Sequence, residues 1–232
     1  VVSAFASDFA RIDNMKYGIA PGQSAERGLA TTRAILGYVG KKLAPYQGIK
    51  SDIYGWQDVY QQRYPILGVR WMANCEVPDL DLLPDRHDIG SIQFSAGLEL
   101  GLMHLGLWGM SGLVRLGLPI GLERMAPALL WVSNWFNGFG SKDGGMHVIL
   151  AGESAQNPGQ RIARSWFIVA RNGDGPHIPT IPAIILATRI SNGDPPDAGA
   201  TPCLGLISLT DYLAELETLE IETITHLRSI AP

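Results

Sequence analysis

The alternation of apolar and polar residues along the chain predicts several strands separated by helices. Apolar positions alternate with polar ones in residues 11–20, 146–154, 161–172 and 221–227, as in half-buried strands. Runs rich in Ile, Val, Tyr and Trp between Leu43 and Pro78, punctuated by glycine and proline, indicate further short strands. The predicted fold class is therefore α+β, with a mixed or largely antiparallel sheet and helices packed on one face.

Apolar residues at helical spacing predict helices in the remaining segments. These helices are expected over residues 1–10, 25–39, 181–193 and 209–217. Ser24 is expected to cap the second helix, because its hydroxyl can accept an amide hydrogen bond in the first turn. The acidic stretch from Pro78 to Asp88 lacks the central glycine and the closing glutamate of a calcium loop, so a solvated connection is expected there.

Residues 96–121 are the most apolar segment and predict one arm of an apolar helical hairpin. Glu99, His104 and Arg115 interrupt the segment, and a bilayer span needs about 20 consecutive apolar residues, so a membrane helix is not expected. Each glycine in the segment costs about 1 kcal/mol in a helix relative to alanine, and close packing on another helix would offset this cost. With a second helix over residues 122–136, the hairpin is expected to form either internal core or an oligomer interface.

Composition and charge exclude several functional classes. The chain is 46% hydrophobic and 17% charged, as expected for a folded globular protein. A formal net charge of -4 and scattered Lys and Arg residues disfavour nucleic acid as a partner. Cys75 and Cys203 lack metal-binding or thiol-exchange spacing, and no secretory signal opens the sequence, so reduced thiols and a cytoplasmic location are expected.

The sequence contains no self-sufficient catalytic signature. It has no GxGxxG after a strand, no phosphate-binding GxxxxGK[ST], no HExxH and no GxSxG. Gly138 and Gly140 form a GxG, but the residues before them continue a helix, so a flexible break is the simpler interpretation. We expect neither a cofactor nor a metal to be bound by this chain alone.

The best candidate site is the loop Asn172–Pro182, between a strand and a helix. Free amides at the helix start can bind a substrate carboxylate, and the glycines let a ligand approach the backbone. His177 can transfer a proton near neutral pH, and Asp174 is the second catalytic candidate. Gly175 and Thr180 are candidates for substrate binding. A rigid turn is the alternative, because Asn-Gly and Asp-Gly are ordinary turn pairs.

A second candidate is the junction after the first strand, with Gln23 and Arg27 as substrate-binding residues. The guanidinium of Arg27 can bind a carboxylate through two hydrogen bonds. Structural capping is the alternative at this junction. His104, at helical spacing from Trp108, is expected to be a core histidine because burial disfavours its charged form.

Several stretches resemble bacterial saccharopine dehydrogenase-like proteins, over almost the whole chain. They are GIAPGQSAERGLATTRAIL, GWQDV, CEVPDLDLLPDRH, FSAGLELGLMHLGLW, GGMHV, NGDGPHIPTIPA and PCLGLISLTDYLAELETLEIET. Proteins of that family begin with a Rossmann domain, and this chain is similar to the part after it. The resemblance implies that residues 1–232 are the carboxy-terminal, substrate-side and dimerisation domain, with the amino-terminal Rossmann domain absent from this chain.

The chemistry implied by the resemblance is hydride transfer between a nicotinamide and a carbon bonded to nitrogen. The full-length protein would then be a homodimeric oxidoreductase that uses NAD or NADP and acts on a CH–NH bond of an amino-acid-like small molecule. The isolated chain is expected to be inactive. The lysine and histidine pair of the lysine-forming fungal enzymes has no match here, so the resemblance does not identify the substrate.

Two other functions stay open on the sequence alone. The chain can be a non-catalytic binding or assembly module whose apolar hairpin docks a partner, a lipid or a membrane surface. It can also be a metabolite sensor that has lost catalysis.

Overall fold

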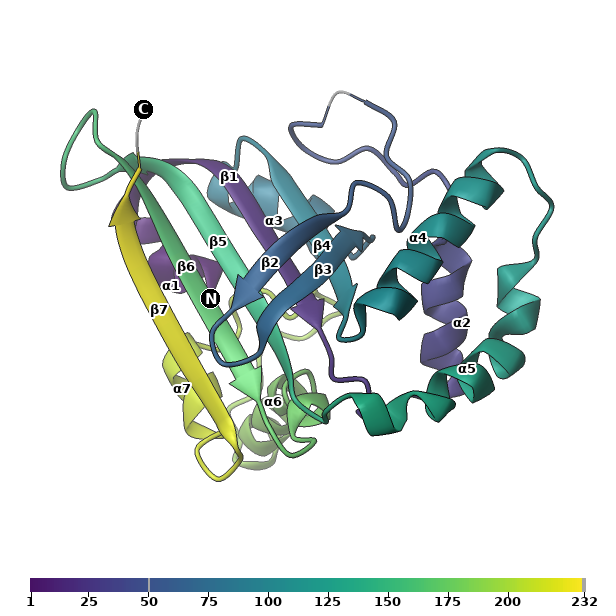
Figure 1. The fold of residues 1–232 in the computed structure, drawn as a ribbon. Helices are drawn as coiled ribbons and strands as arrows, with labels where there is room; N and C mark the ends of the chain where they lie inside the picture. Colours follow the sequence, from purple (N-terminus) through teal and green to yellow (C-terminus); the bar gives the residue numbers. More distant parts are fainter. Residues whose placement is uncertain (50, 231–232) are drawn as a thin grey trace.

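A mixed sheet forms the centre of the molecule, in a computed structural model that describes residues 1–49 and 51–230 (Figure 1). Its seven strands follow the order β2-β3-β4-β1-β5-β6-β7. They are β1 Phe9–Ala20, β2 Tyr60–Tyr64, β3 Gly68–Asn74, β4 Ile92–Leu98, β5 Gly144–Ser154, β6 Arg161–Ala170 and β7 Ile221–Ser229. β1 and β4 pair in parallel and the other neighbours pair antiparallel. The predicted α+β class with a mixed sheet is confirmed.

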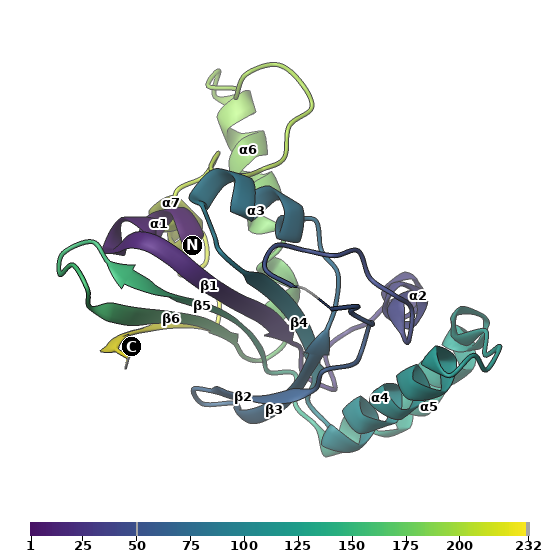
Figure 2. The same cartoon turned by 90° about the horizontal axis from the view of Figure 1, so that it is seen from above.

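The helices form two groups (Figure 2). One group covers a face of the sheet and consists of α1 Val2–Phe5, α3 Asp79–His87, α6 Ile181–Ser191 and α7 Leu209–Ala214. The other group lies beside the sheet and consists of α2 Leu29–Tyr38, α4 Gly101–Arg115 and α5 Ala126–Trp135. Short 3₁₀ turns complete the connections: η1 Ala6–Asp8, η2 Leu122–Met125, η3 Asn137–Phe139 and η4 Gly175–His177.

The main core lies between the sheet and the first group of helices. Alternate residues of the central strands point to this side because successive side chains of a strand face opposite ways. Met15 of β1 and Ile168 of β6 are fully buried there. Leu83 of α3 and Ile185 of α6 belong to the same cluster. The alternation along the strands therefore gives the sheet an apolar face, and these helices cover that face.

On its opposite face the sheet curls until the edge strand β2 meets β5. The hydroxyl of Tyr64 on β2 lies 2.7 Å from Nδ1 of His147 on β5. Gly18 permits this approach, since a Cβ there would lie 2.3 Å from the Ser95 carbonyl oxygen and 2.9 Å from Cε of Met72. A small separate core that includes Tyr64, Met72 and Phe167 forms inside the curl.

The acidic stretch is a helix, so the prediction of a solvated connection between Pro78 and Asp88 is wrong. Asp79 and Asp81 lie in the first turn of α3, where negative charge interacts favourably with the helix amino end. Leu80 and Leu83, three residues apart, are buried and attach the helix to the sheet. Three leucines in nine residues, of which two are buried, are too few for a clear periodic signal.

Three predicted boundaries are also wrong. The opening helix ends at Phe5, because the strand β1 already begins at Phe9. The second helix begins at Leu29, since the Ser24 hydroxyl does not cap it but donates to the carbonyl of Asn137. Residues 92–98 form β4, so the apolar helix begins only at Gly101.

Both helices of the predicted hairpin are present, but they do not pack closely on each other. α5 packs mainly against α2. A Cβ added at Gly106, Gly109 or Gly112 of α4 would have no atom within 4 Å, so no described residue packs closely over these glycines. Within the described ranges, no helix has the length and apolar character needed to cross a membrane.

Candidate functional site

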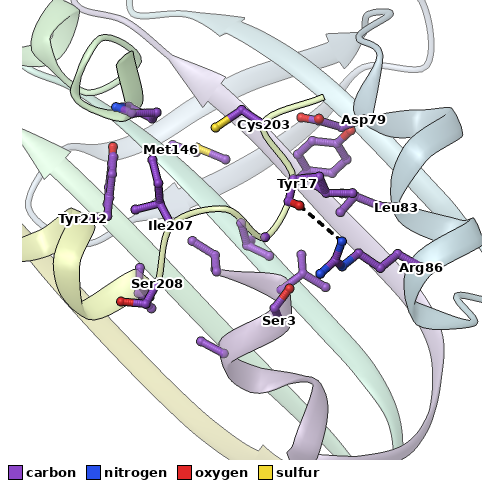
Figure 3. Close-up of a pocket in the computed structure, with 18 of the residues that line it drawn as sticks. Ser3, Tyr17, Asp79, Leu83, Arg86, Met146, Cys203, Ile207, Ser208 and Tyr212 are labelled. Atoms are coloured by element: carbon purple, nitrogen blue, oxygen red, sulfur yellow. Dashed lines mark hydrogen bonds between the residues drawn. The ribbon is translucent and has the colours of Figure 1, made fainter. Parts of the chain in front are cut away.

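A cavity of about 610 Å³ lies between the sheet and the helices that cover it (Figure 3). Met15 and Tyr17 of β1, with Met146 and Val148 of β5, form its floor. Its walls come from α1, from α3 and from residues 203–212, which include the start of α7. The cavity therefore combines an apolar floor with walls from segments that are far apart in the sequence.

Tyr17 supplies a polar group to this apolar floor. Its side chain is 2% exposed, and its hydroxyl has no hydrogen-bond partner among the residues that the structure describes. Burial, with smaller contributions from Asp79 and Tyr46, raises the pKa of Tyr17 well above its ordinary value. The phenol is therefore neutral at physiological pH and can donate a hydrogen bond to a ligand. A buried hydroxyl left without a partner costs about 1–3 kcal/mol, which a bound acceptor would recover.

Two opposite charges from α3 border the same cavity. Seven residues, or two helical turns, separate Asp79 from Arg86, so both lie on one face of the helix, about 10 Å apart along its axis. Desolvation raises the pKa of the Asp79 carboxyl above its usual value. Nη1 of Arg86 donates to the Leu204 carbonyl at 3.2 Å, the bond drawn in Figure 3. The cavity thus offers an anion and a cation over an apolar floor.

Other polar contacts hold the wall of residues 203–212 in place. Tyr212 donates its hydroxyl to the carbonyl of Ile178 at 2.9 Å, and burial raises its pKa to about 12. Arg189 of α6 donates to the Leu206 carbonyl at 2.8 Å. Ser208 caps α7 by accepting the amide of Asp211 at 3.0 Å. These side chains stabilise the wall, and Tyr17, Asp79 and Arg86 are the groups best placed to contact a ligand.

No protein-family model matches the sequence, and no curated protein matches it. Among solved structures, the chain is similar to apo histidine-tagged saccharopine dehydrogenase (L-Glu forming) from Saccharomyces cerevisiae. The TM-score is 0.53 and the identity 9%, over 93% of this chain and 67% of that chain. The chain has a saccharopine dehydrogenase-like fold. The resemblance found in the sequence is therefore confirmed for the fold, and membership of the bacterial family stays a prediction.

In this saccharopine dehydrogenase-like fold, the predicted loop Asn172–Pro182 lies at the end of the sheet where β6 stops. Asp174 accepts the amide of Glu220 at 2.7 Å, which ties the loop to the start of β7. The hydroxyl of Thr180 donates to the carbonyl of His177 at 2.8 Å, and the His177 side chain is exposed. Only Pro182 of this loop lines the cavity.

Gln23 and Arg27 lie on the side of α2 and α5. Gln23 is 1% exposed, and its side-chain amide donates to the carbonyl of Ser133 at 2.9 Å. Arg27 donates to the carbonyl of Gln23. Neither residue lines the cavity above Tyr17.

One loop links the two predicted sets at the same end of the sheet. The carbonyl of Ser141 accepts the amide of Ser24 at 2.8 Å, and Asp143 accepts the amide of Asn172 at 3.1 Å. The loop with Ser141 and Asp143 therefore contacts both predicted sites, the junction near Gln23 and the loop Asn172–Pro182, but the two sites do not line one cavity. The ligand-binding and catalytic roles proposed for His177, Asp174, Gly175, Thr180, Gln23 and Arg27 stay predictions.

The charged pair of the cavity was not predicted from the sequence. Tyr17 is an apolar member of a predicted strand, and Asp79 and Arg86 fall in the stretch predicted to be solvated. Recognising that stretch as a helix would have placed the two charges on one face, because they are seven residues apart. The seven-residue spacing of Asp79 and Arg86 is therefore the feature of the sequence that could have indicated this charged pair.

The described residues do not fit a dinucleotide. Pyrophosphate binding needs glycines that open a helix after a strand, whereas Gly138 and Gly140 follow α5. A Cβ at Gly140 would lie 2.4 Å from Cβ of Gln23 and 2.7 Å from a carboxylate oxygen of Glu99, so this glycine serves internal packing. Within the same ranges, no group of three or more His, Cys, Asp or Glu residues could hold a metal ion.

Proposed function

We propose that this chain is the substrate-side domain of an NAD(P)-dependent oxidoreductase that acts on a CH–NH bond of an amino-acid-like molecule. The observation that carries the proposal is the cavity above Tyr17, where Asp79 and Arg86 face a shared apolar floor. An amino acid carries a carboxylate, an amine and a side chain. Arg86 complements the carboxylate, Asp79 the amine and the apolar floor an apolar side chain. The similarity in fold to a protein named saccharopine dehydrogenase supports the reaction class.

The proposed roles follow from the charges. Arg86 binds the substrate carboxylate through the guanidinium N–H groups that Leu204 does not occupy. Asp79 accepts hydrogen bonds from the substrate amine, and its raised pKa reflects desolvation that a bound cation would offset. Tyr17 donates to an oxygen or nitrogen of the substrate, while the methionines of the floor contact its apolar part.

In this proposal the remaining parts of the enzyme lie outside the cavity. NAD or NADP, which supplies the hydride acceptor or donor, would be held by a Rossmann domain that precedes Val1 in the same polypeptide, and the enzyme would work in the cytoplasm. The roles of His177 and Asp174 in proton transfer, and of Gly175 and Thr180 in substrate contact, stay separate predictions, because only Pro182 of their loop lines the cavity. A metabolite sensor would share the same cavity, and turnover by the intact protein separates the two functions.

An NMR titration with three matched probes tests the cavity. L-leucine carries both charged groups, isocaproate lacks the amine, and isoamylamine lacks the carboxylate. We expect Arg86→Gln to weaken L-leucine and isocaproate at least ten-fold and to leave isoamylamine unchanged, because one charge-assisted contact is lost. Asp79→Asn should weaken L-leucine and isoamylamine and spare isocaproate.

Matched controls come from exposed residues outside the cavity. Arg33→Gln on α2 and Asp85→Asn on α3 remove the same charges and should change none of the three affinities. A wild-type chain that binds none of the probes, or variants that weaken all three equally, would contradict the proposed binding mode.

We also infer that the surface of α4 and α5 mediates a homodimer. The large apolar residues of these two helices and of the segments that follow each of them are 39–83% exposed: Leu102, Leu105, Trp108, Leu113, Leu116, Leu118, Met125, Trp131, Val132, Trp135 and Phe139. With aromatic side chains contributing about 150–250 Å² each when fully exposed, the patch is on the order of 1,000 Å². A typical monomer exposes about 300–600 Å² in its largest patch, and a standard interface buries about 800 Å² per partner. The exposed area therefore matches what a second copy would cover.

A further inference from the structure

An apolar groove lies between α2, α4 and α5, away from the cavity above Tyr17. Its volume is about 210 Å³, and most of its wall is aliphatic. Leu36 of α2, Leu107 of α4 and Leu129 of α5 represent the three helices that form it. The groove exists because α5 packs mainly against α2 and leaves space next to α4.

Arg27 is the charged residue in the wall of this groove. Its side chain is half-buried, and desolvation lowers the pKa of its guanidinium. No acidic side chain among the described residues lies within ion-pair distance of it, and its hydrogen bond goes to the neutral carbonyl of Gln23. By contrast, the buried Arg70 pairs with Glu99 at 3.1 Å. Withdrawing a cation from water without a counter-ion is unfavourable, so Arg27 is complementary to an external anion.

The groove can also adapt to an apolar chain. Gly106 lies in its wall, and a Cβ there would have no atom within 4 Å. Met103 and Met110 line the same wall, and the unbranched thioether side chain of methionine adjusts to irregular shapes. Space between helices of a bundle is a common location for small-molecule sites.

We propose that this groove binds a small carboxylate with an apolar tail, such as a medium-chain fatty acid. The carboxylate lies at Arg27 and the tail extends between α4 and α5. The proposal is independent of the amino-acid site, because the groove and the cavity share no lining residue. The groove shares one residue, Val132, with the proposed homodimer surface.

Calorimetric titration with octanoate, below its critical micelle concentration, tests the proposal, and octanol is the uncharged probe. Octanoate should bind the wild-type chain more tightly than octanol. Arg27→Gln should weaken octanoate at least ten-fold and leave octanol unchanged, and Arg27→Lys, which keeps the charge, should give an intermediate loss. Gly106→Leu should abolish binding of both probes, because its side chain would fill the groove.

The control variant Arg33→Gln removes an exposed arginine from α2, six residues further along the chain, and should change neither affinity. Two results would overturn the proposal. One is an octanoate affinity that Arg27→Gln leaves unchanged. The other is a wild-type chain that binds no octanoate but whose oligomeric state changes on Gly106→Leu, which would show that a second copy occupies the groove.

Discussion

Two histidines, His104 and His147, are buried, and burial lowers the pKa of both. His104 and His147 are both 0% exposed, and burial lowers the pKa of each to about 4, with Lys16 contributing at His147. His104 packs against Trp56 with ring centroids 5.4 Å apart, and neither of its ring nitrogens has a partner in the described chain. The core position predicted for His104 is confirmed. His147 gave no signal in the sequence, because its partner Tyr64 lies 83 residues away.

These histidines should make the protein less stable as the pH falls from 7 to 5. In the folded protein the pKa of each histidine lies below the ordinary histidine value of 6.5. The unfolded chain therefore binds protons between pH 6.5 and pH 4 that the folded chain does not bind. The contribution of these histidines to the free energy of unfolding is fully present above pH 6.5 and declines towards pH 4. At pH 5 the free energy of unfolding is lower by roughly 2 kcal/mol per histidine. Urea denaturation at both pH values measures the change.

His104→Leu is expected to reduce this pH dependence by about half. At pH 7 it should be neutral or stabilising, because it removes two buried nitrogens without partners. Equal pH dependence for His104→Leu and the wild type would show that folding does not shift the pKa of His104.

At the scale of the elements, Glu99 joins several segments at one end of the sheet. Its carboxylate accepts the Gln23 amide at 2.7 Å, the Ser141 amide at 2.8 Å, the Ser141 hydroxyl at 2.9 Å and Nη2 of Arg70 at 3.1 Å. Burial alone would raise the pKa of Glu99, but these hydrogen bonds and the charge of Arg70 lower it overall. The contacts fix the exits of β1 and β4 and the loop before β5.

Glu99→Gln is therefore expected to lower the free energy of unfolding by about 3 kcal/mol at pH 7, because Arg70 loses its counter-ion in a buried site. The lowered pKa means that the stabilisation is present above pH 4.5 and declines as the carboxylate is protonated. The difference between the two proteins should thus narrow in acid. Glu123→Gln, whose exposed carboxylate pairs with Lys41, should have no measurable effect. A similar loss in both variants would refute the special role of Glu99.

The accuracy of prediction differed among elements for physical reasons. β1, β5 and β6 could be predicted from the sequence alone, because apolar and polar residues alternate over nine to twelve residues in 11–20, 146–154 and 161–172. α6 could be predicted because Pro182 opens it and Gly193 follows its end. β4 was missed because its apolar residues are separated from those of α4 by a single polar residue, Glu99, which does not mark a clear boundary between the two patterns.

At the scale of the whole molecule, the sequence could not predict how distant segments meet. The cavity above Tyr17 combines β1, α3 and residues 203–212, and the curl of the sheet depends on the contact of Tyr64 with His147. Such contacts are set by packing and not by local pattern. The sequence did identify α4 and α5 as unusually apolar, and the structure leaves much of that surface exposed.

We expect the exposed apolar surface of α4 and α5 to form the interface of a homodimer. Sedimentation equilibrium should show a dimer of the wild-type chain, and the double variant Leu116→Glu with Trp135→Glu should be monomeric, because charges would be buried at the interface. Leu227→Glu places a charge on β7, where the leucine is 54% exposed, and should leave the dimer intact. A monomeric wild type that co-sediments with lipid vesicles would favour a membrane surface instead.

The proposed function requires this chain to be the substrate-side part of a larger oxidoreductase. Sequencing the gene upstream of the codon for Val1 tests that claim most directly. We predict an in-frame segment that encodes a strand, a GxGxxG turn and a helix, the elements that hold a dinucleotide. A start codon immediately before Val1, with no nucleotide-binding fold encoded ahead of it, would contradict the account.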